Sequence, residues 1–245
     1  MILGVRIDAI NQNELDDHVR SFFASPKAHK IFTPNAEMLL LAHRNLSFKE
    51  CLNQGDLNIC DGVSLTFAER FLHPLTTKVI QRVTGVDTLE RICALASETR
   101  KRVLLVGGSV GVAEKASEMV HTRYPHLHIK GLNPGTVNAT SIDQRLIDSI
   151  NTFAPDVLAV ALGHGKQEQF ICSILKELPS VKVAIGVGGA LDYLSGNVRR
   201  APIWMRKLGL EWLYRLMRQP KRIGRIFNAV IIFPLAVIWD RIKAL

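Results

Sequence analysis

Short apolar runs alternate with helix-length amphipathic stretches from the N-terminus to about residue 195. Six runs have the length and composition of buried strands: 29–32, 57–60, 103–106, 127–130, 157–162 and 181–187. Seven stretches between them have helical periodicity: 13–24, 36–42, 63–72, 87–98, 112–124, 142–153 and 167–178. Apolar strands that alternate with helices of this length are typical of a parallel sheet with both faces covered. The pattern therefore predicts an α/β fold with a doubly wound sheet.

The pattern changes after Val198. The chain up to Val198 has 20 Lys/Arg and 20 Asp/Glu, whereas residues 199–245 have 11 Lys/Arg against Glu211 and Asp240, which accounts for the whole net charge of +9. This segment also holds all three tryptophans. We predict a Rossmann-like α/β domain over residues 1–198 and a basic, amphipathic helical appendage over residues 199–245.

The appendage contains an apolar stretch, 226–239, flanked by basic residues. At about 14 residues it is shorter than the ~20 that cross a bilayer as a helix. We expect an interfacial helix on an anionic membrane surface. The alternative is a helix docked on its own domain or on a second subunit, which leaves a homo-oligomer open. The N-terminus has no basic segment before an apolar one, which predicts a protein without a secretory signal, on the inner face of the membrane.

The four cysteines, Cys51, Cys60, Cys93 and Cys172, have neither C-x-x-C nor metal-ligand spacing. In a reducing cytoplasm they are expected to be buried free thiols.

Polar residues and glycines follow five of the predicted strands, where ligands of open α/β sheets bind. These strand-exit residues are Thr33, Asn35, Glu37, Asp61, Gly107, Gly108, Gly163, Lys166, Gln167, Glu168, Gly188, Gly189 and Asp192. We expect them to line one shared crevice.

Asp61 is the candidate general base, because it follows a strand directly and precedes a glycine that lets the chain turn into the crevice. An N-cap for the helix over 63–72 is the alternative at this point. The turn at Gly107-Gly108 resembles a phosphate loop only loosely, and a tight strand-to-helix connection explains it equally well. It lacks the G-x-G-x-x-G spacing, so a NAD-type dehydrogenase is a weak alternative.

No D-x-D motif occurs in the sequence, so a nucleotide diphosphate would not be held by a divalent cation on paired carboxylates. Arginine can supply the charge instead. Arg215, Arg218, Arg222 and Arg225 fall on one helical face, which is either a diphosphate site, a solvated basic face or a lipid-headgroup patch. Apolar residues interleave with these cations at helical spacing, and no nucleic-acid-binding fold surrounds them, so we expect no nucleic-acid partner.

Several short motifs together resemble the WecG/TagA/CpsF family of bacterial glycosyltransferases. They are Thr33-Pro34-Asn35-x-Glu37, Asp61-Gly62, Arg82-x-x-Gly85-x-Asp87, Leu105-Val106-Gly107-Gly108, Gly163-x-x-Lys166-Gln167-Glu168, Gly186-Val187-Gly188-Gly189, Arg200-Ala201-Pro202, Gly209-Leu210-Glu211-Trp212-Leu213-Tyr214-Arg215-Leu216 and Pro220-x-Arg222. The run from Gly209 to Leu216 is highly specific. Gly165 departs from the proline common before Lys-Gln-Glu, and Leu191 stands where an aromatic residue is common.

The resemblance implies an inverting, metal-independent, membrane-associated enzyme without a cofactor. Such an enzyme moves N-acetylmannosamine, its uronic acid or a related hexose from a UDP donor to a polyprenyl-diphosphate-linked sugar, for a cell-surface polymer. A catalytically silent subunit of a polymer-assembly complex is the alternative.

The resemblance also implies roles for single residues. Asp61 would be the base, Thr33, Asn35 and Gln167 would line the sugar and acceptor pocket, and Gly188, Gly189 and Asp192 would approach the nucleotide. Arg215, Arg222 and Arg225 would close over the departing UDP. The remaining motif residues are expected among the substrate-binding set: Glu37, Arg82, Gly107, Gly108, Gly163, Lys166 and Glu168.

Overall fold

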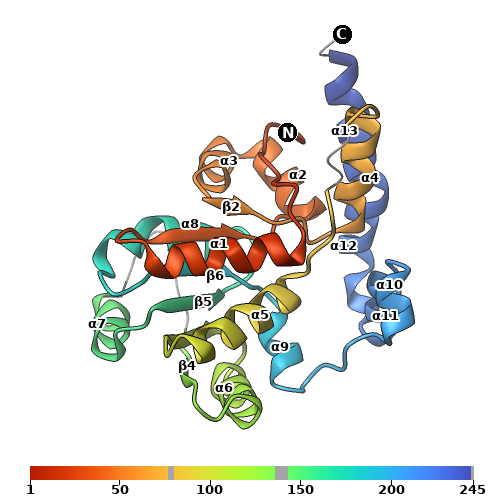
Figure 1. The fold of residues 1–245 in the computed structure, drawn as a ribbon. Coiled ribbons are helices and arrows are strands. Elements are labelled where there is room, and N and C mark those ends of the chain that lie inside the picture. Colours follow the sequence, from red (N-terminus) through yellow and green to blue (C-terminus); the bar gives the residue numbers. More distant parts are fainter. Residues whose placement is uncertain (77–79, 136–142, 244–245) are drawn as a thin grey trace.

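The computed structural model describes residues 1–76, 80–135 and 143–243, and its centre is one six-stranded parallel sheet (Figure 1). The strand order is β2-β1-β6-β5-β3-β4, with all neighbours parallel. The strands are β1 (His29–Phe32), β2 (Leu57–Asn58), β3 (Arg102–Gly107), β4 (His128–Leu132), β5 (Val157–Ala161) and β6 (Val183–Gly186). All six predicted strands and the fold class are confirmed.

Helices cover both faces of the sheet. One layer consists of α1 (Gln12–Ala24), α5 (Gly85–Glu98), α6 (Val112–Arg123) and α9 (Ala190–Leu194), and the other of α2 (Ala36–Arg44), α3 (Leu46–Asn53), α7 (Gln144–Phe153) and α8 (Lys166–Ile174). Successive strand residues enter opposite cores, as Ile31 and Phe32 do. This alternation, with both sides apolar, is why the strands read as continuous apolar runs in the sequence.

The predicted helices are found within a few residues of their expected bounds, and Ile142, the expected start of one, lies outside the described residues. Two short helices, α3 and α9, were missed. Asn45 ends α2 and also caps α3 with its side chain, so no turn sequence separates the two helices. The prediction of free thiols is wrong for one pair: Cys51 on α3 and Cys172 on α8 form a disulfide, whereas Cys60 and Cys93 are free and buried.

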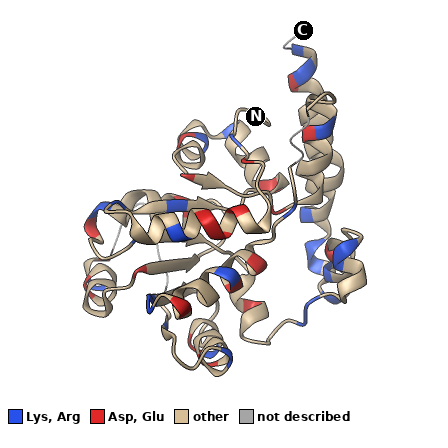
Figure 2. Cartoon of the chain, in the orientation of Figure 1, with Lys and Arg blue, Asp and Glu red and all other residues tan. Residues whose placement is uncertain are grey.

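The appendage begins with α10 (Ile203–Lys207) and α11 (Glu211–Arg218), where the lysines and arginines gather in Figure 2. A helical run then extends from Pro220 to Lys243 through α12 (Ile223–Phe227), a π-helical turn (Asn228–Ile232) and α13 (Phe233–Lys243). Its 24 residues are enough, by length and composition, to cross a membrane. The helix is therefore longer than the apolar stretch of about 14 residues within it, and its interfacial position stays a prediction. The π turn directly precedes Pro234, whose ring and missing N–H would disrupt a regular helix, so the run continues through that residue.

Helix α13 packs against α2 and against α4 (Val63–Leu72), and α4 and α13 project together from the sheet (Figure 1). Phe233 and Val237 of α13 are buried in the same core as α2. The appendage is thus anchored by apolar side chains and not by charge alone.

Phe233→Ala should lower the free energy of unfolding by about 3–5 kcal/mol, because a fully buried ring is lost. Phe227→Ala, at an exposed position of the same helical run, is the matched control and should change it by less than about 0.5 kcal/mol. The measurement is denaturant titration followed by tryptophan fluorescence. Equal effects of the two variants would mean that α13 is not docked on the body.

Candidate active site

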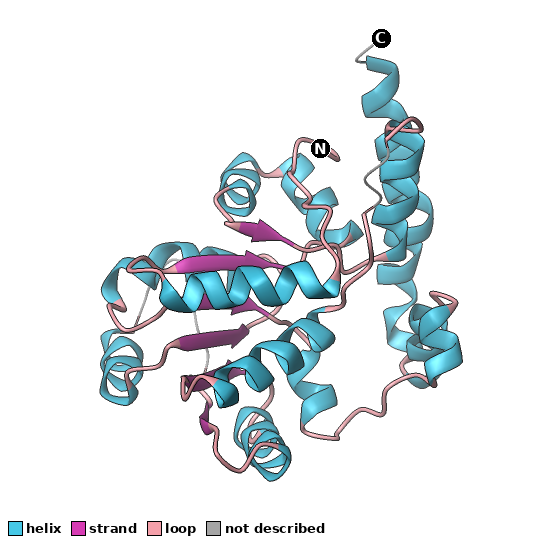
Figure 3. Cartoon of the chain, viewed as in Figure 1, coloured by secondary structure: helices cyan, strands magenta, loops and turns pink. Residues whose placement is uncertain are grey.

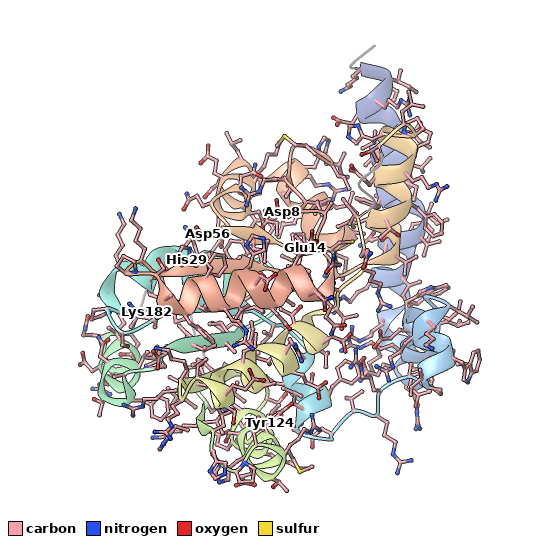
Figure 4. The ribbon with its side chains drawn as sticks, in the orientation of Figure 1. Asp8, Glu14, His29, Asp56, Tyr124 and Lys182 are labelled. Carbon is pink, nitrogen blue, oxygen red and sulfur yellow. A yellow bond between two sulfur atoms is a disulfide. The ribbon has the colours of Figure 1, made fainter. Side chains whose placement is uncertain are left out.

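A cavity of about 700 Å³ lies where strands β1, β2 and β6 end, between the body and the appendage. The strand arrows in Figure 3 point toward this side of the molecule. Figure 4 labels His29, Asp56 and Lys182 at the opposite, amino end, where His29 Nδ1 lies 3.2 Å from Asp56 and the His29 amide donates to the Lys182 carbonyl. Eight of the predicted site residues line the cavity: Asn35, Glu37, Asp61, Arg82, Gly189, Arg215, Arg222 and Arg225.

Asp61 lies in the part of the cavity that charged and polar residues line, next to the Gly85 turn that begins α5. Burial raises the pKa of Asp61 to about 7, although Arg82, the Gly85 amide and Arg215 favour the charged form. Helix α4 has Gly62 at its N-cap position and no side-chain cap, so Asp61 does not cap this helix. A carboxylate with a pKa near neutrality can both accept and release a proton at physiological pH.

Asp61 differs from the other two carboxylates of the cavity. Glu37 accepts a hydrogen bond from Arg225 Nε at 2.7 Å, and Glu211 accepts one from Arg82 at 2.6 Å. Among the described residues that line the cavity, Asp61 is the carboxylate without an ion pair. It is therefore the one whose lone pairs remain available to a substrate.

A cluster of buried polar side chains lies at the carboxyl ends of β1 and β6. Thr33 donates to the Gly186 carbonyl at 3.2 Å, and Gln167 accepts from the Gly188 amide at 3.0 Å while donating to Glu168 at 2.6 Å. Burial raises the pKa of Glu168 to about 7, and its carboxyl caps α8 through the Gly165 amide at 2.7 Å. These predicted residues fix the loop before Gly189 and lie below the cavity lining.

Ion pairs join the appendage to the body beside Asp61. Arg82 bonds Glu211 of α11, while Arg200 bonds Asp87 at 2.7 Å and lies 3.8 Å from the other oxygen of Glu211. Burial alone would raise the pKa of Asp87, but Arg200 and Thr84 hold it below its usual value. Glu211 and Arg200 were missed as site residues. Their motifs were visible in the sequence, but their partners are more than 110 residues away.

Three arginines of the appendage line the cavity. Arg215 lies over the Tyr193 ring, 5.0 Å from its centroid, and a Cβ added to Gly189 would lie 2.8 Å from the guanidinium. Burial and the neighbouring charges of Arg215 and Arg225 lower the pKa of Arg222 to about 10. Mutual repulsion among cations held this close is relieved by a bound anion. Of the predicted basic face, Arg218 does not line this cavity.

The Gly107-Gly108 turn lies away from the cavity lining. Gly107 has a φ of +104°, and a Cβ there would lie 2.5 Å from the Ala161 carbonyl, so the approach of β5 accounts for this glycine. The turn also has G-x-S-x-G spacing, which sequence reasoning overlooked, but no histidine among the described residues bonds Ser109. A contact of Gly107 or Gly108 with substrate remains a prediction.

The remaining predicted residues surround the exits of β5 and β6 outside the lining: Gly163, Lys166, Gly188 and Asp192. Gly165 has a φ of +85°, which proline cannot adopt, so the departure from the family motif changes the backbone of this loop. Neighbouring His164 lies 3.4 Å from Arg225. Leu191 is buried in the core and does not face the cavity.

Among the described residues, no three His, Cys, Asp or Glu side chains converge as metal ligands. The positive charge in the cavity comes from Arg82 of the body and from arginines of α11, α12 and the turn between them. The arginines of this cavity can bind phosphate oxygens through charge-assisted hydrogen bonds, and its free carboxylate can accept a proton.

Comparison with known proteins gives one family. The model described as "Glycosyl transferase WecG/TagA/CpsF family" matches residues 1–245. Proteins of Staphylococcus aureus strains MRSA252 and MW2 are each 30% identical over 227 residues, which cover 92% of this chain and 87% of the relative. Both are named N-acetylglucosaminyldiphosphoundecaprenol N-acetyl-beta-D-mannosaminyltransferase.

Asp61→Asn should make the protein more stable at pH 8. The folded state holds the Asp61 proton up to about pH 7 and the unfolded chain loses it near pH 3.8. Stability from this group is therefore present at low pH and is lost as the pH rises between these values. The neutral amide avoids that loss, and we expect a rise in Tm of about 2–4 °C at pH 8, the shift that ~1 kcal/mol gives at this chain length.

The difference between wild type and Asp61→Asn should shrink toward pH 4. Asp17→Asn, at an exposed position of α1, is the control and should leave Tm unchanged at both pH values. A lower Tm for Asp61→Asn at pH 8 would show that the charged carboxylate stabilises the fold.

Proposed function

The chain belongs to the WecG/TagA/CpsF family of glycosyltransferases, and we propose that it transfers an N-acetylmannosamine-type sugar from a UDP donor to a polyprenyl-diphosphate-linked sugar. The observation that carries the proposal is Asp61, the one unpaired carboxylate among the described residues of a cavity whose other charges are arginines and paired glutamates. The names of the relatives support N-acetylmannosamine as the sugar and an N-acetylglucosaminyl-diphosphate lipid as the acceptor.

In the proposed reaction, Asp61 removes the proton of an acceptor hydroxyl, and the freed oxygen lone pair attacks the anomeric carbon of the donor. The bond from that carbon to the diphosphate oxygen breaks, and its electron pair leaves with UDP. A single displacement at this carbon inverts its configuration. A double displacement would need a second free carboxylate, and Glu37 and Glu211 are both paired with arginines.

The arginines Arg215, Arg222 and Arg225 would stabilise the charge that develops on the departing diphosphate. Their guanidinium groups already line the cavity, so little reorganisation is needed when the bond breaks. This arrangement supports a metal-independent reaction.

The other strand-exit residues take supporting roles in this proposal. Asn35 lines the cavity while its side-chain oxygen caps α2, which leaves its amide group for the acceptor sugar. Gly189 and Asp192 lie beside Arg215 and would border the nucleotide, with Gly188 held by Gln167. Thr33 does not line the cavity, and it would contribute indirectly, because its hydrogen bond to the Gly186 carbonyl fixes the backbone at the end of β6.

The apolar helical run of the appendage supports a membrane-associated enzyme. Only 11% of its most apolar window is buried inside the protein. We place the active site on the inner face of the cell membrane, where the charged appendage would meet anionic lipid.

Asp61→Ala should reduce transfer by at least about 10²–10⁴-fold, the usual contribution of a general base. The assay follows transfer from UDP-N-acetylmannosamine, its uronic acid or related UDP-hexoses to N-acetylglucosaminyl-diphospho-polyprenol. For the wild type, kcat/KM should rise with pH through about 7, because the base acts deprotonated and its pKa lies there. Unchanged turnover of the variant would remove Asp61 from this role, and no transfer from any donor would favour a catalytically silent subunit.

Arg222→Ala should weaken binding of UDP about 10–100-fold, the loss of one charge-assisted hydrogen-bonding partner. Arg218→Ala is the matched control, because Arg218 is on the adjacent helix but outside the main cavity. Calorimetric titration measures both, without and with EDTA. Loss of UDP binding in EDTA would contradict the metal-independent arrangement.

A further inference from the structure

The cavity continues beyond the polar residues that the proposed transfer uses. Its second half lies between α4 and the helical run of the appendage. We call this half the apolar groove; its walls are Phe67 and Phe71 of α4 and Val230, Phe233, Pro234 and Ile238 of the appendage. These six residues are all apolar, and the sugar and diphosphate of a UDP-sugar have no group that such walls would recognise.

Charge is ordered along the cavity. Asp61 and Arg82 lie where α4 begins, and Arg222 and Arg225 precede Ile226, the residue at which the apolar lining of the appendage starts. A ligand that fills both halves must therefore carry an anionic group followed by a hydrocarbon chain. A polyprenyl diphosphate has this order, since its diphosphate is esterified directly to an isoprenoid.

Apolar side chains on and beside the same two helices are also exposed. Phe67, which lines the groove, is 69% exposed, Leu75, three residues after the end of α4, is 94% exposed, and Trp239 and Ile242 of α13 are 59% and 58% exposed. Helices α4 and α13 project together from the sheet (Figure 1), and Trp239 and Ile242 lie in the last turns of α13. Exposed apolar residues on adjacent helices mark an interaction surface for lipid. The apolar groove thus lies between two helices whose exposed apolar side chains are suited to contact with lipid.

A basic residue of α13 contacts Phe71, one of the walls of the groove. Arg241 of α13 donates to the Phe71 carbonyl and lies over the Phe71 ring, 4.8 Å from its centroid. This contact holds α4 and α13 together at a point where a cation can reach lipid phosphate.

We propose that the apolar groove binds the first isoprene units of the acceptor lipid, with its diphosphate at the polar end of the groove beside Arg222 and Arg225, which would then contact the diphosphates of both substrates. This proposal rests on the proposed function, and it assigns α4 a role in acceptor binding. Recognition of the chain within the protein places the acceptor sugar near Asp61, whereas partition into the membrane alone would not fix its position.

The first test measures binding without transfer. Farnesyl diphosphate and inorganic diphosphate are titrated into the full-length protein in detergent, and the wild type should bind the former at least about tenfold more tightly, a small part of what burying several CH₂ groups can give. The double variant Val230→Ser/Ile238→Ser places two hydroxyls in the groove and should abolish this preference. Equal affinities for the two ligands in the wild type would overturn the proposal.

The matched control is Ile231→Ser/Leu235→Ser. Both residues are exposed on the same helical run but do not line the cavity. This control removes a similar amount of apolar surface and should keep the preference for farnesyl diphosphate. An equal loss in both double variants would show that surface partition, and not the groove, binds the chain.

The second test uses transfer. With a polyprenyl acceptor in detergent, KM of the groove variant should rise about tenfold, while KM for an acceptor with a propyl chain stays unchanged. Failure of the wild type to use either acceptor would contradict the proposed function, and farnesyl diphosphate binding would still decide the groove. A rise in KM for both acceptors would show a general disturbance of the site and overturn the specific role of the groove.

Discussion

The ion pair between Arg82 and Glu211 is the contact on which the assembled site depends. It joins the body to the appendage directly beside Asp61, and its two residues are separated by 129 positions in the chain. Glu211 begins α11, and Arg215 follows it by about one helical turn, so fixing Glu211 fixes Arg215 over Gly189. Arg200 adds a second attachment through Asp87. Loss of either partner of the central pair would leave a partly buried charge without compensation, so body and appendage are held as one unit.

The charges inside the cavity are unfavourable until a substrate is bound. Burial raises the pKa of Asp61 to about 7, and crowding with burial lowers that of Arg222 to about 10. Each group would be stabilised by what the proposed substrates bring, a hydroxyl proton for the carboxylate and a diphosphate for the arginines. Burial of the charged Asp61 and Arg222 side chains costs folding stability, but the same desolvation makes these groups reactive.

Sequence patterns identified the sheet because its strands are short, apolar and buried on both faces, as 103–106 shows. They also predicted the place of Asp61 at a strand exit, where it lines the cavity, since position after a strand is a local property; its role as the base stays a prediction. The Cys51–Cys172 disulfide and the Arg82–Glu211 pair could not be predicted, because each requires knowing how distant helices pack. The last helix is longer than the apolar stretch 226–239 because it also includes the charged residues on both sides of that stretch, and a π turn lets it continue through Pro234.

Helix α4 runs from the proposed catalytic base, Asp61, toward the exposed apolar surface. Its periodicity predicted one more helix beside the sheet, yet it projects from the sheet and pairs with α13 (Figure 1). It begins two residues after Asp61 and ends at Leu72, so its ten residues span about 15 Å from the proposed base to the exposed apolar end. Phe67 and Phe71 fall four residues apart on the face that lines the cavity. In the proposed arrangement, this one helix would set the distance between the reacting hydroxyl and the membrane surface, and the appendage lines the other side of the same cavity.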